Sequence, residues 1–427
     1  MSKVLVSDVA VINKENFNIT DVDYINYLDT SSITNNKILG FQKLDIENDK
    51  IPSRAKRKVK NDTIVYSSVR PRLCHFGILK DIPKNTVVST GFITIDAKEE
   101  KIDPYYLYYL LTTNDKIEYI SNIADTAVSS YPSINPSDIE NMEINIIDDL
   151  EQQREIVAIL KSIDKKIENN NKINEELESM AKTIYDYWFL QFEFPNEEGK
   201  PYKSNGGKMV WNEELKREIP EGWEVETLEK NISLVKGISY KSKNIESNEG
   251  IPMINLASID INRNYKPNEL KYFKGNYKEE KEVKFNDMLI ACTDLTRNAD
   301  IIGSPVLVDN LYDKYLYSMD LAKLNVVSNK FNKYYLYMTL RTDFYHKYIK
   351  GYASGTNVLH LDVNGILWYK VYIPNGYIQN KFGEIIKNIH EKKSQLSKEN
   401  QELTSLRDFL LPLLMNGQVG FKEEAFA

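Results

Sequence analysis

The strongest concentration of positive charge in the sequence falls in two neighbouring stretches. They are PSRAKRKVKND (52–62) and VRPRL (69–73), and they contain Arg54, Lys56, Arg57, Lys58, Lys60, Arg70 and Arg72. Such cations neutralise DNA phosphates, whose contacts supply much of the affinity for DNA. An arginine can also read guanine through two hydrogen bonds in the major groove. The alternative is a solvated surface loop, as most charge runs are.

The second half of the sequence has weaker candidates of the same kind. VKGISYKSKN (235–244) contains Lys236, Tyr240 and Lys241, and TDLTRN (293–298) contains Arg297. SGTN (354–357) contains Thr356 and is either a phosphate-contacting turn or simply a turn. We predict a DNA-binding set that consists of Arg54, Lys56, Arg57, Lys58, Arg70, Arg72, Lys236, Tyr240, Lys241, Arg297 and Thr356.

Motifs for catalysis are missing from the sequence. GGKM (206–209) fails the phosphate-loop pattern in spacing and in its final residue. NPSD (135–138) lacks the second proline and the aromatic residue of an adenine-methyltransferase loop, and it fits a proline-led helix that begins near Ser137. The four histidines form no metal-binding spacing; they are His75, His346, His360 and His390. We therefore expect a binding protein with no catalytic residues and no metal site.

Length and composition limit the number of domains and the kind of binding surface that the chain can have. A chain of 427 residues is long enough for two or three domains. Its net charge is −7, so any DNA-binding surface has to be local. Cys74 and Cys292 are the two cysteines, which does not suggest a disulfide framework. The sequence shows no apolar run of membrane-spanning length and no signal-peptide pattern, and we expect a cytoplasmic protein.

The segments that are expected to position these residues occur as a repeat in the sequence. INEELESM (173–180) and ENQELTSL (399–406) place Asn174 and Asn400 at an offset of 400 − 174 = 226 residues. Apolar residues at alternating steps of four and three predict a helix around each phrase. The first seam is Ile156, Leu160, Ile163, Ile167, Asn170, Asn174, Leu177, Ala181, Ile184 and Trp188. The second is Phe382, Ile386, Ile389, Lys393, Leu396, Asn400, Leu403, Arg407, Leu410 and Leu414. Two unrelated amphipathic helices remain the alternative to a pair that packs together.

Fainter repeats precede each helix. KNDTIVYSS (60–68) matches FNDMLIACT (285–293), and DPYYLYYLL (103–111) matches NKYYLYMTL (332–340). NMEINII (141–147) matches WYKVYIP (368–374), a closing strand before each long helix. These segments predict an α+β fold, with strands at Asp62–Ser67, Val87–Asp96, Asp287–Cys292 and Leu316–Asn325. The domains we predict are 1–150, a helix at 151–194, a linker and second domain at 195–378, a helix at 379–417 and a tail at 418–427.

Three phrases carry a family resemblance that covers essentially the whole chain. PNEEGKPYKSNGGKMVWNEELKREIPEGWEVETL (195–228) resembles the inter-repeat segment of the specificity subunit of type I restriction–modification systems. LEQQREIVAIL (150–160) resembles the start of that family's first spacer helix, and LTSLRDFLLPLLMNGQV (403–419) the end of its second. The first half departs from the pattern because it lacks the IPEGW (219–223) lead-in of the second.

The resemblance implies two tandem α/β target-recognition domains, each followed by a long helix, with the helices paired as an antiparallel coiled coil. It implies a non-catalytic subunit that reads a bipartite site in double-stranded DNA. Expected partners are two methyltransferase subunits and, in the full complex, two restriction–translocase subunits. These would hold S-adenosylmethionine, ATP and Mg, while this chain binds no cofactor itself; the sequence leaves open whether a nuclease subunit exists. The alternatives are a coiled-coil scaffold without DNA binding and the recognition part of a methyltransferase.

Overall fold

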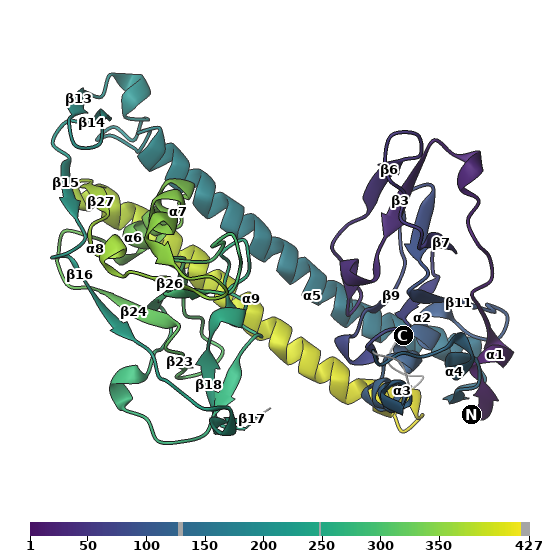
Figure 1. Ribbon diagram of the computed structural model, residues 1–427. Helices are drawn as coiled ribbons and strands as arrows, with labels where there is room; N and C mark the ends of the chain where they lie inside the picture. Colours follow the sequence, from purple (N-terminus) through teal and green to yellow (C-terminus); the bar gives the residue numbers. More distant parts are fainter. Residues whose placement is uncertain (127–130, 247–248, 420–427) are drawn as a thin grey trace, which may run out of the picture. The chain divides into compact units, whose positions relative to one another are not determined.

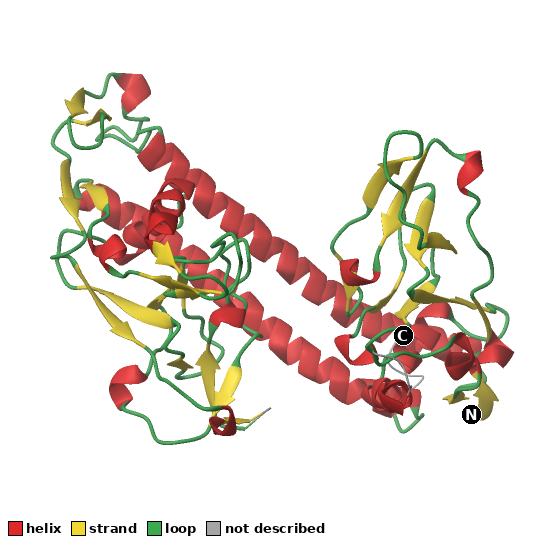
Figure 2. Cartoon of the chain, in the orientation of Figure 1, coloured by secondary structure: helices red, strands yellow, loops and turns green. Residues whose placement is uncertain are grey.

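The computed structural model describes residues 1–126, 131–246 and 249–419, and the chain forms two compact units (Figures 1 and 2). Unit 1 consists of residues 1–166 and 403–427, and unit 2 consists of residues 167–402. Each unit therefore contains one globular α/β part and one portion of each of two long helices. No helix in the described part of the chain is long and apolar enough to cross a lipid bilayer.

Unit 1 has two four-stranded sheets, in the orders β6-β3-β10-β7 and β2-β11-β8-β9, and a separate antiparallel pair β1-β12. The strands are β1 (Ser2–Leu5), β2 (Ala10–Ile12), β3 (Tyr24–Leu28), β4 (Ile33–Thr34), β5 (Lys37–Ile38), β6 (Gln42–Asp45), β7 (Ala55–Lys58), β8 (Ile64–Ser67), β9 (Phe76–Ile78), β10 (Thr86–Ser89), β11 (Phe92–Ala97) and β12 (Glu143–Ile146). The helices of its globular part are α1 (Val6–Val9), α2 (Pro104–Leu111), α3 (Asn114–Thr126) and α4 (Pro136–Glu140).

Unit 2 repeats this arrangement with sheets β17-β19-β18-β23 and β16-β24-β20-β22 and a pair β15-β27. The strands are β13 (Met209–Asn212), β14 (Arg217–Pro220), β15 (Glu224–Thr227), β16 (Ile232–Lys236), β17 (Ile245–Glu246), β18 (Ile251–Ile254), β19 (Lys271–Phe273), β20 (Met288–Ala291), β21 (Thr293–Asp294), β22 (Pro305–Leu307), β23 (Leu316–Tyr317), β24 (Leu321–Val326), β25 (Ala353–Ser354), β26 (Leu359–Leu361) and β27 (Lys370–Ile373). Its shorter helices are α6 (Lys333–Leu340), α7 (Asp343–Ile349) and α8 (Asn364–Leu367).

The alternation of side chains along the central strands explains the layers in each unit. In β8, Ile64 and Tyr66 pack in the same core cluster as α2, whereas Val65 packs with residues of the other sheet. In β20, Ile290 belongs to the cluster that contains α6, and Leu289 belongs to a separate cluster. Because successive strand residues point to opposite faces, one buried sheet is covered by helices on one side and by strands on the other.

The two units share a topology that confirms the repeat predicted from the sequence. Each has one parallel strand pair in its first sheet, β3 with β10 and β18 with β23. In each, a tyrosine-rich helix follows the second sheet, and an antiparallel strand pair precedes a long helix. The first half lacks the IPEGW lead-in and yet begins with an equivalent strand, because β1 pairs with β12 as β15 pairs with β27.

The long helices are α5 (Leu150–Tyr185), continued by a π-helical turn at Asp186–Leu190, and α9 (Gly376–Met415). In unit 2 the Asn170 side-chain amide donates to Asn400 Oδ1 over 2.9 Å, and Phe382 packs on Trp188 at a centroid distance of 5.8 Å. From Asn170 to Trp188 the chain advances along α5, while the contacts on α9 go back from Asn400 to Phe382. The two helices are therefore antiparallel, as predicted. In unit 1 Arg407 bonds Asp164 at 3.1 Å. Asn400 pairs with Asn170, and not with Asn174, which is its equivalent in the repeat.

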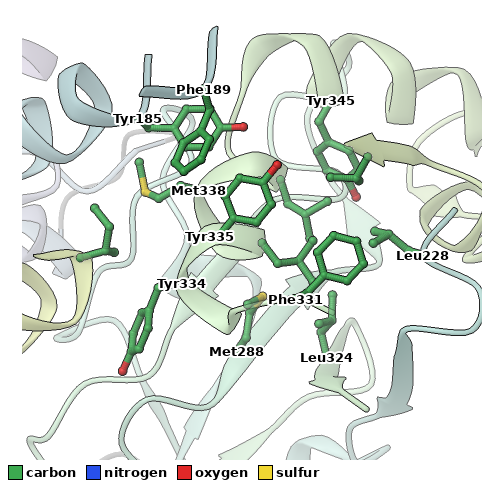
Figure 3. Packing of buried hydrophobic residues seen from close by; sticks show 14 of the residues in the cluster. Tyr185, Phe189, Leu228, Met288, Leu324, Phe331, Tyr334, Tyr335, Met338 and Tyr345 are labelled. Carbon is green, nitrogen blue, oxygen red and sulfur yellow. The ribbon is translucent and has the colours of Figure 1, made fainter. Parts of the chain in front are cut away.

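The core of unit 2 is rich in aromatic residues, and Figure 3 shows Phe189, Phe331 and Tyr335 packed among aliphatic side chains. Phe189 contacts Tyr335 at a ring-centroid distance of 4.7 Å and Phe382 at 4.9 Å. The linker contributes to this core, because Phe194 stacks on Trp223 at 5.2 Å and both rings are buried. The linker also contains a regular element, the β13-β14 hairpin.

Candidate DNA interface

A tight turn in unit 1 joins the two predicted basic segments. This turn, Ser89–Gly91, connects β10 to β11. The Thr90 N–H donates to the carbonyl of Arg54 at 2.8 Å, and the Ser68 N–H donates to the carbonyl of Gly91 at 2.9 Å. The backbone of the turn therefore holds the start of one basic segment next to the start of the other.

The middle of the first basic segment is a strand, and turns flank it on both sides. Residues Ala55–Lys58 form β7 at the edge of its sheet, where Ala55 is buried and Lys56 is exposed. Lys58 forms an ion pair with Glu15 at 2.6 Å, and the half-buried Arg57 has its guanidinium 3.5 Å from Asn16 Oδ1. Lysines on an edge strand also prevent sheet-to-sheet association. The segment therefore has a structural use besides any role in DNA binding. Its exposed cations are Arg54, Lys56, Lys58 and Lys60, and of these Arg54 and Lys56 form no ion pair with the described residues.

Arg70 and Arg72 lie on one loop but in different surroundings. Arg72 forms an ion pair with Asp125 of α3 at 3.0 Å. The Arg70 guanidinium lies over the ring of Tyr131, 4.9 Å from its centroid. A cavity of about 230 Å³ opens beside both arginines and is lined by Pro71, Leu73, Ser121, Asp125 and Pro132 as well. The two residues that the sequence predicted as equivalent are thus held differently.

Unit 2 has a turn at the corresponding place, between β23 and β24. The Met319 N–H donates to the carbonyl of Ile238 at 2.8 Å, and the Cys292 N–H donates to the carbonyl of Asp320 at 2.7 Å. These bonds bring the segment that begins at Lys236 next to the segment that leads to Arg297. The arrangement repeats that of unit 1, although the sequences of the two turns differ.

Arg297 and Thr356 are carried by segments that share a small sheet. β21 and β25 both pair with β26, in the order β21-β26-β25. The buried carboxylate of Asp294 accepts the N–H groups of Thr296, Ile301 and Ile302 at 2.7, 2.7 and 2.9 Å and so fixes the loop. Arg297 on this loop and Thr356 on the β25-β26 turn are both exposed. The structure therefore places these two predicted residues on connected surface loops.

The remaining predicted residues of unit 2 follow β16. Lys236, the last residue of β16, is exposed, as is Lys241. The half-buried Tyr240 accepts a hydrogen bond from Lys271 Nζ at 2.9 Å, and that ammonium group also lies over the Tyr240 ring. Lys271 is thus a cation that the sequence analysis missed, because β19 is distant in the chain and its single lysine forms no motif.

Exposed apolar residues near the turns were also missed. Met319 lies in the turn of unit 2 and is 50% exposed, and Leu295 lies beside Asp294 and is 65% exposed. In unit 1 Val69 is 39% exposed next to Arg70. Apolar side chains of this kind can contact the methyl group of thymine in the major groove. Nothing in the sequence marked them, since exposure of a single apolar residue depends on the fold around it.

The fold and these residues together define a class of protein: a duplicated α/β protein with one set of exposed cations beside the same turn in each copy. The comparisons with known proteins show the family to which such a chain belongs. The family model for the type I restriction modification DNA specificity domain matches residues 5–179. The type I restriction enzyme MjaIX specificity subunit of Methanocaldococcus jannaschii is 30% identical over 351 residues, which cover 80% of this chain and 75% of that protein.

Two further matches extend over nearly the whole chain. The type I restriction enzyme HindI specificity subunit of Haemophilus influenzae is 24% identical over 92% of this chain and 94% of its own length. A crystal structure of a type I restriction–modification system S subunit from M. genitalium has the same fold, with a TM-score of 0.55 and 16% identity over 97% of this chain and 96% of that one. The chain belongs to the family of type I restriction–modification specificity subunits.

Proposed function

We propose that this chain supplies the DNA sequence specificity of a type I restriction–modification complex by reading a bipartite site in double-stranded DNA. The observation that carries the proposal is the duplication: each unit has its own turn with its own exposed cations beside it. One reader per unit gives a recognition site in two parts, separated by base pairs that neither unit reads. The predicted DNA-binding residues in both units are part of this proposal.

The proposal includes recruitment of two methyltransferase subunits and, in the complete complex, of restriction subunits. An apolar stripe supports a helical partner, since Ile173, Met180 and Tyr187 recur every seven residues and are 43%, 50% and 40% exposed. Heptad spacing on an outer helix face is the pattern that another helix packs against. S-adenosylmethionine, ATP and Mg would belong to those partners, so the chain alone is proposed to have no enzymatic activity.

The test is to express the chain with and without its cognate methyltransferase subunit in cells that lack other adenine methylation, and then to sequence the methylated bases. We expect one methylated motif with two specified parts and an unspecified gap, and we expect it only when both subunits are present. Methylation of DNA by the chain alone, or a motif without a gap, would contradict the proposal. If the chain were a scaffold that never touches DNA, the methyltransferase subunit would methylate the same bases with the chain as without it.

A further inference from the structure

The loop that carries Arg70 has an unusual backbone. Arg70 (φ 48°, ψ 65°) and Cys74 (φ 54°, ψ 36°) both adopt the left-handed conformation, on either side of a short 3₁₀ turn at Pro71–Leu73. This conformation is unfavourable for residues other than glycine and persists only where the surroundings enforce it. The Arg70 N–H donates to the carbonyl of Pro132 at 2.9 Å, and its own carbonyl accepts from the Leu73 N–H at 2.9 Å. The backbone of Arg70 is therefore fixed on both sides.

The side chain of Arg70 is held as well, but by a ring and not by a carboxylate. Its guanidinium lies 4.9 Å from the centroid of Tyr131, a ring that is 58% exposed. Within the described residues, Arg70 forms no ion pair, whereas Arg72 is 3.0 Å from Asp125 and 3.4 Å from Asn122. Stacking on an aromatic face fixes the plane of a guanidinium while leaving the N–H donors at its edge available.

The neighbours of Arg70 favour a base over a phosphate as its target. Val69 beside it is an exposed apolar residue, which suits the apolar contacts made with base edges. A phosphate needs only a point charge, which the exposed Lys56 on β7 provides without a fixed plane. A planar, oriented fork is what the O6 and N7 atoms of guanine require.

We infer that Arg70 reads a guanine in the major groove in the part of the DNA site that unit 1 contacts. Tyr131 orients the guanidinium, and Arg72 is a positioning residue that anchors the loop to α3 through Asp125. This inference rests on the proposed function, because it assigns one base contact within the bipartite site.

The experiment uses the complex of the full chain with its methyltransferase subunit. The methylated motif is determined first, and binding is then measured on duplexes that carry this motif or a single base-pair change in it. For Arg70→Lys we expect the preference for one G·C pair to fall roughly 5- to 150-fold, the range typical of a two-bond base contact. The salt dependence of binding should stay the same, since the charge is retained.

Arg154→Lys is the matched control in the same unit: Arg154 is exposed on α5 and lies outside the predicted DNA-binding set, so the motif should stay intact. Arg72→Lys tests the competing assignment on the same loop, because lysine can keep the ion pair with Asp125 but cannot form the two-bond fork. Arg70→Ala should lose the same preference as Arg70→Lys, and Tyr131→Leu should lose part of it. Lys56→Ala should weaken binding to every duplex alike and reduce the salt slope by about one.

Three outcomes separate the possibilities. If Arg70→Lys and Arg70→Ala methylate the unchanged motif, or if Arg70→Ala only weakens all duplexes equally, the assignment of Arg70 is wrong while the bipartite reader stands. If Arg72→Lys relaxes the G·C pair and Arg70→Lys does not, the roles of the two arginines are reversed. If the unaltered complex methylates no defined motif, the proposed function fails and this inference fails with it.

Discussion

Asp309 has a buried carboxyl group that accepts hydrogen bonds from the described part of the chain at only one of its two oxygens. Tyr315 donates its hydroxyl to Asp309, and the Leu311 N–H donates to Oδ1 at 3.3 Å. Within the described residues, Oδ2 and the nearby buried hydroxyl of Tyr265 have no hydrogen-bond partner. Burial raises the pKa of Asp309 to about 6, against the lowering effect of its hydrogen bonds.

This raised pKa predicts a pH-dependent stability. The neutral carboxyl is favoured in the folded state, so its contribution is complete below about pH 4 and is lost as the pH rises through about 6. A difference of two pH units corresponds to about 3 kcal/mol. We expect Asp309→Asn to match the unaltered protein at pH 4 and to be more stable by up to about 3 kcal/mol at pH 8, as measured by urea unfolding.

The exposed neighbour Asp313 provides a control. Asp313→Asn should leave the stability profile between pH 4 and pH 8 unchanged. If Asp309→Asn showed the same stability difference at both pH values, the titration of Asp309 would not be the source of the effect.

Charged residues between the two long helices form ion pairs that link one helix to the other. Lys393 and Arg407 interrupt the apolar seam in the sequence, yet each pairs with a carboxylate of the other helix, Lys393 with Glu178 and Arg407 with Asp164. Glu178 also bonds Arg341 of unit 2 at 2.7 Å. Burial raises the pKa of Glu178, but the charges of Arg341 and Lys393 outweigh this effect and lower it to about 2.

Removing this carboxylate should destabilise unit 2, because it leaves two cations without their partner. We expect Glu178→Gln to lower the free energy of unfolding by up to about 3 kcal/mol at pH 7. This is the low end of the range for losing one partner of a buried ion pair, because Glu178 and Lys393 are half-buried. In the unaltered protein this contribution is present above about pH 4.5 and is lost as the pH falls through about 2. Denaturant unfolding at several pH values measures both.

Glu168→Gln on the same helix is the matched control. Glu168 pairs with Lys172 at 2.7 Å with both side chains more than half exposed, and its loss should cost less than about 0.5 kcal/mol. Equal effects of the two substitutions would show that the Glu178 network does not stabilise the fold.

The elements were predictable to the extent that local patterns determine them. Every residue of the two predicted seams is buried or half-buried. This could be predicted because helical periodicity is visible in a single sequence. Val87–Asp96 was predicted as one strand and is two, β10 and β11, since the turn at Ser89–Gly91 has no strong turn signature beyond its glycine. The pairing of Asn400 with Asn170, and of Lys393 with Glu178, depends on a register that only the packed pair defines.

At the scale of the whole molecule, each unit has a core of its own. The largest cluster of unit 1 runs from Val6 to Met415 and contains no residue of unit 2, and the aromatic cluster of unit 2 contains none of unit 1. Two separate cores allow one recognition part to change while the other keeps its fold.

This independence predicts the result of an exchange. Replacing residues 1–150 with those of another family member should change one part of the methylated motif and leave the other part intact. Arg297→Ala should relax only the part that the exchange leaves unchanged, because Arg297 belongs to unit 2. Sequencing of methylated bases checks both, and a change in both parts from either alteration would contradict the two-reader proposal.

The duplication itself was visible in the sequence, but the division into units was not. The sequence predicted globular parts and helices in linear order, whereas the first unit includes residues 403–427. Compactness depends on which segments pack together, and the return of the second helix to the first unit has no local signature. The DNA-binding residues remain predictions, since geometry alone does not test them.

This division has a consequence for the order in which the protein is made. Residues 167–402 are all synthesised before Leu403, so the chain of unit 2 is complete before that of unit 1. Ile156 and Leu160 of the first unit share a core with Leu411 and Leu414, and so this core cannot be complete until Leu414 has been synthesised. At roughly 5–20 residues per second, the delay between Lys166 and Leu403 is on the order of 10–50 s. The unit whose synthesis begins first is the one whose chain is completed last.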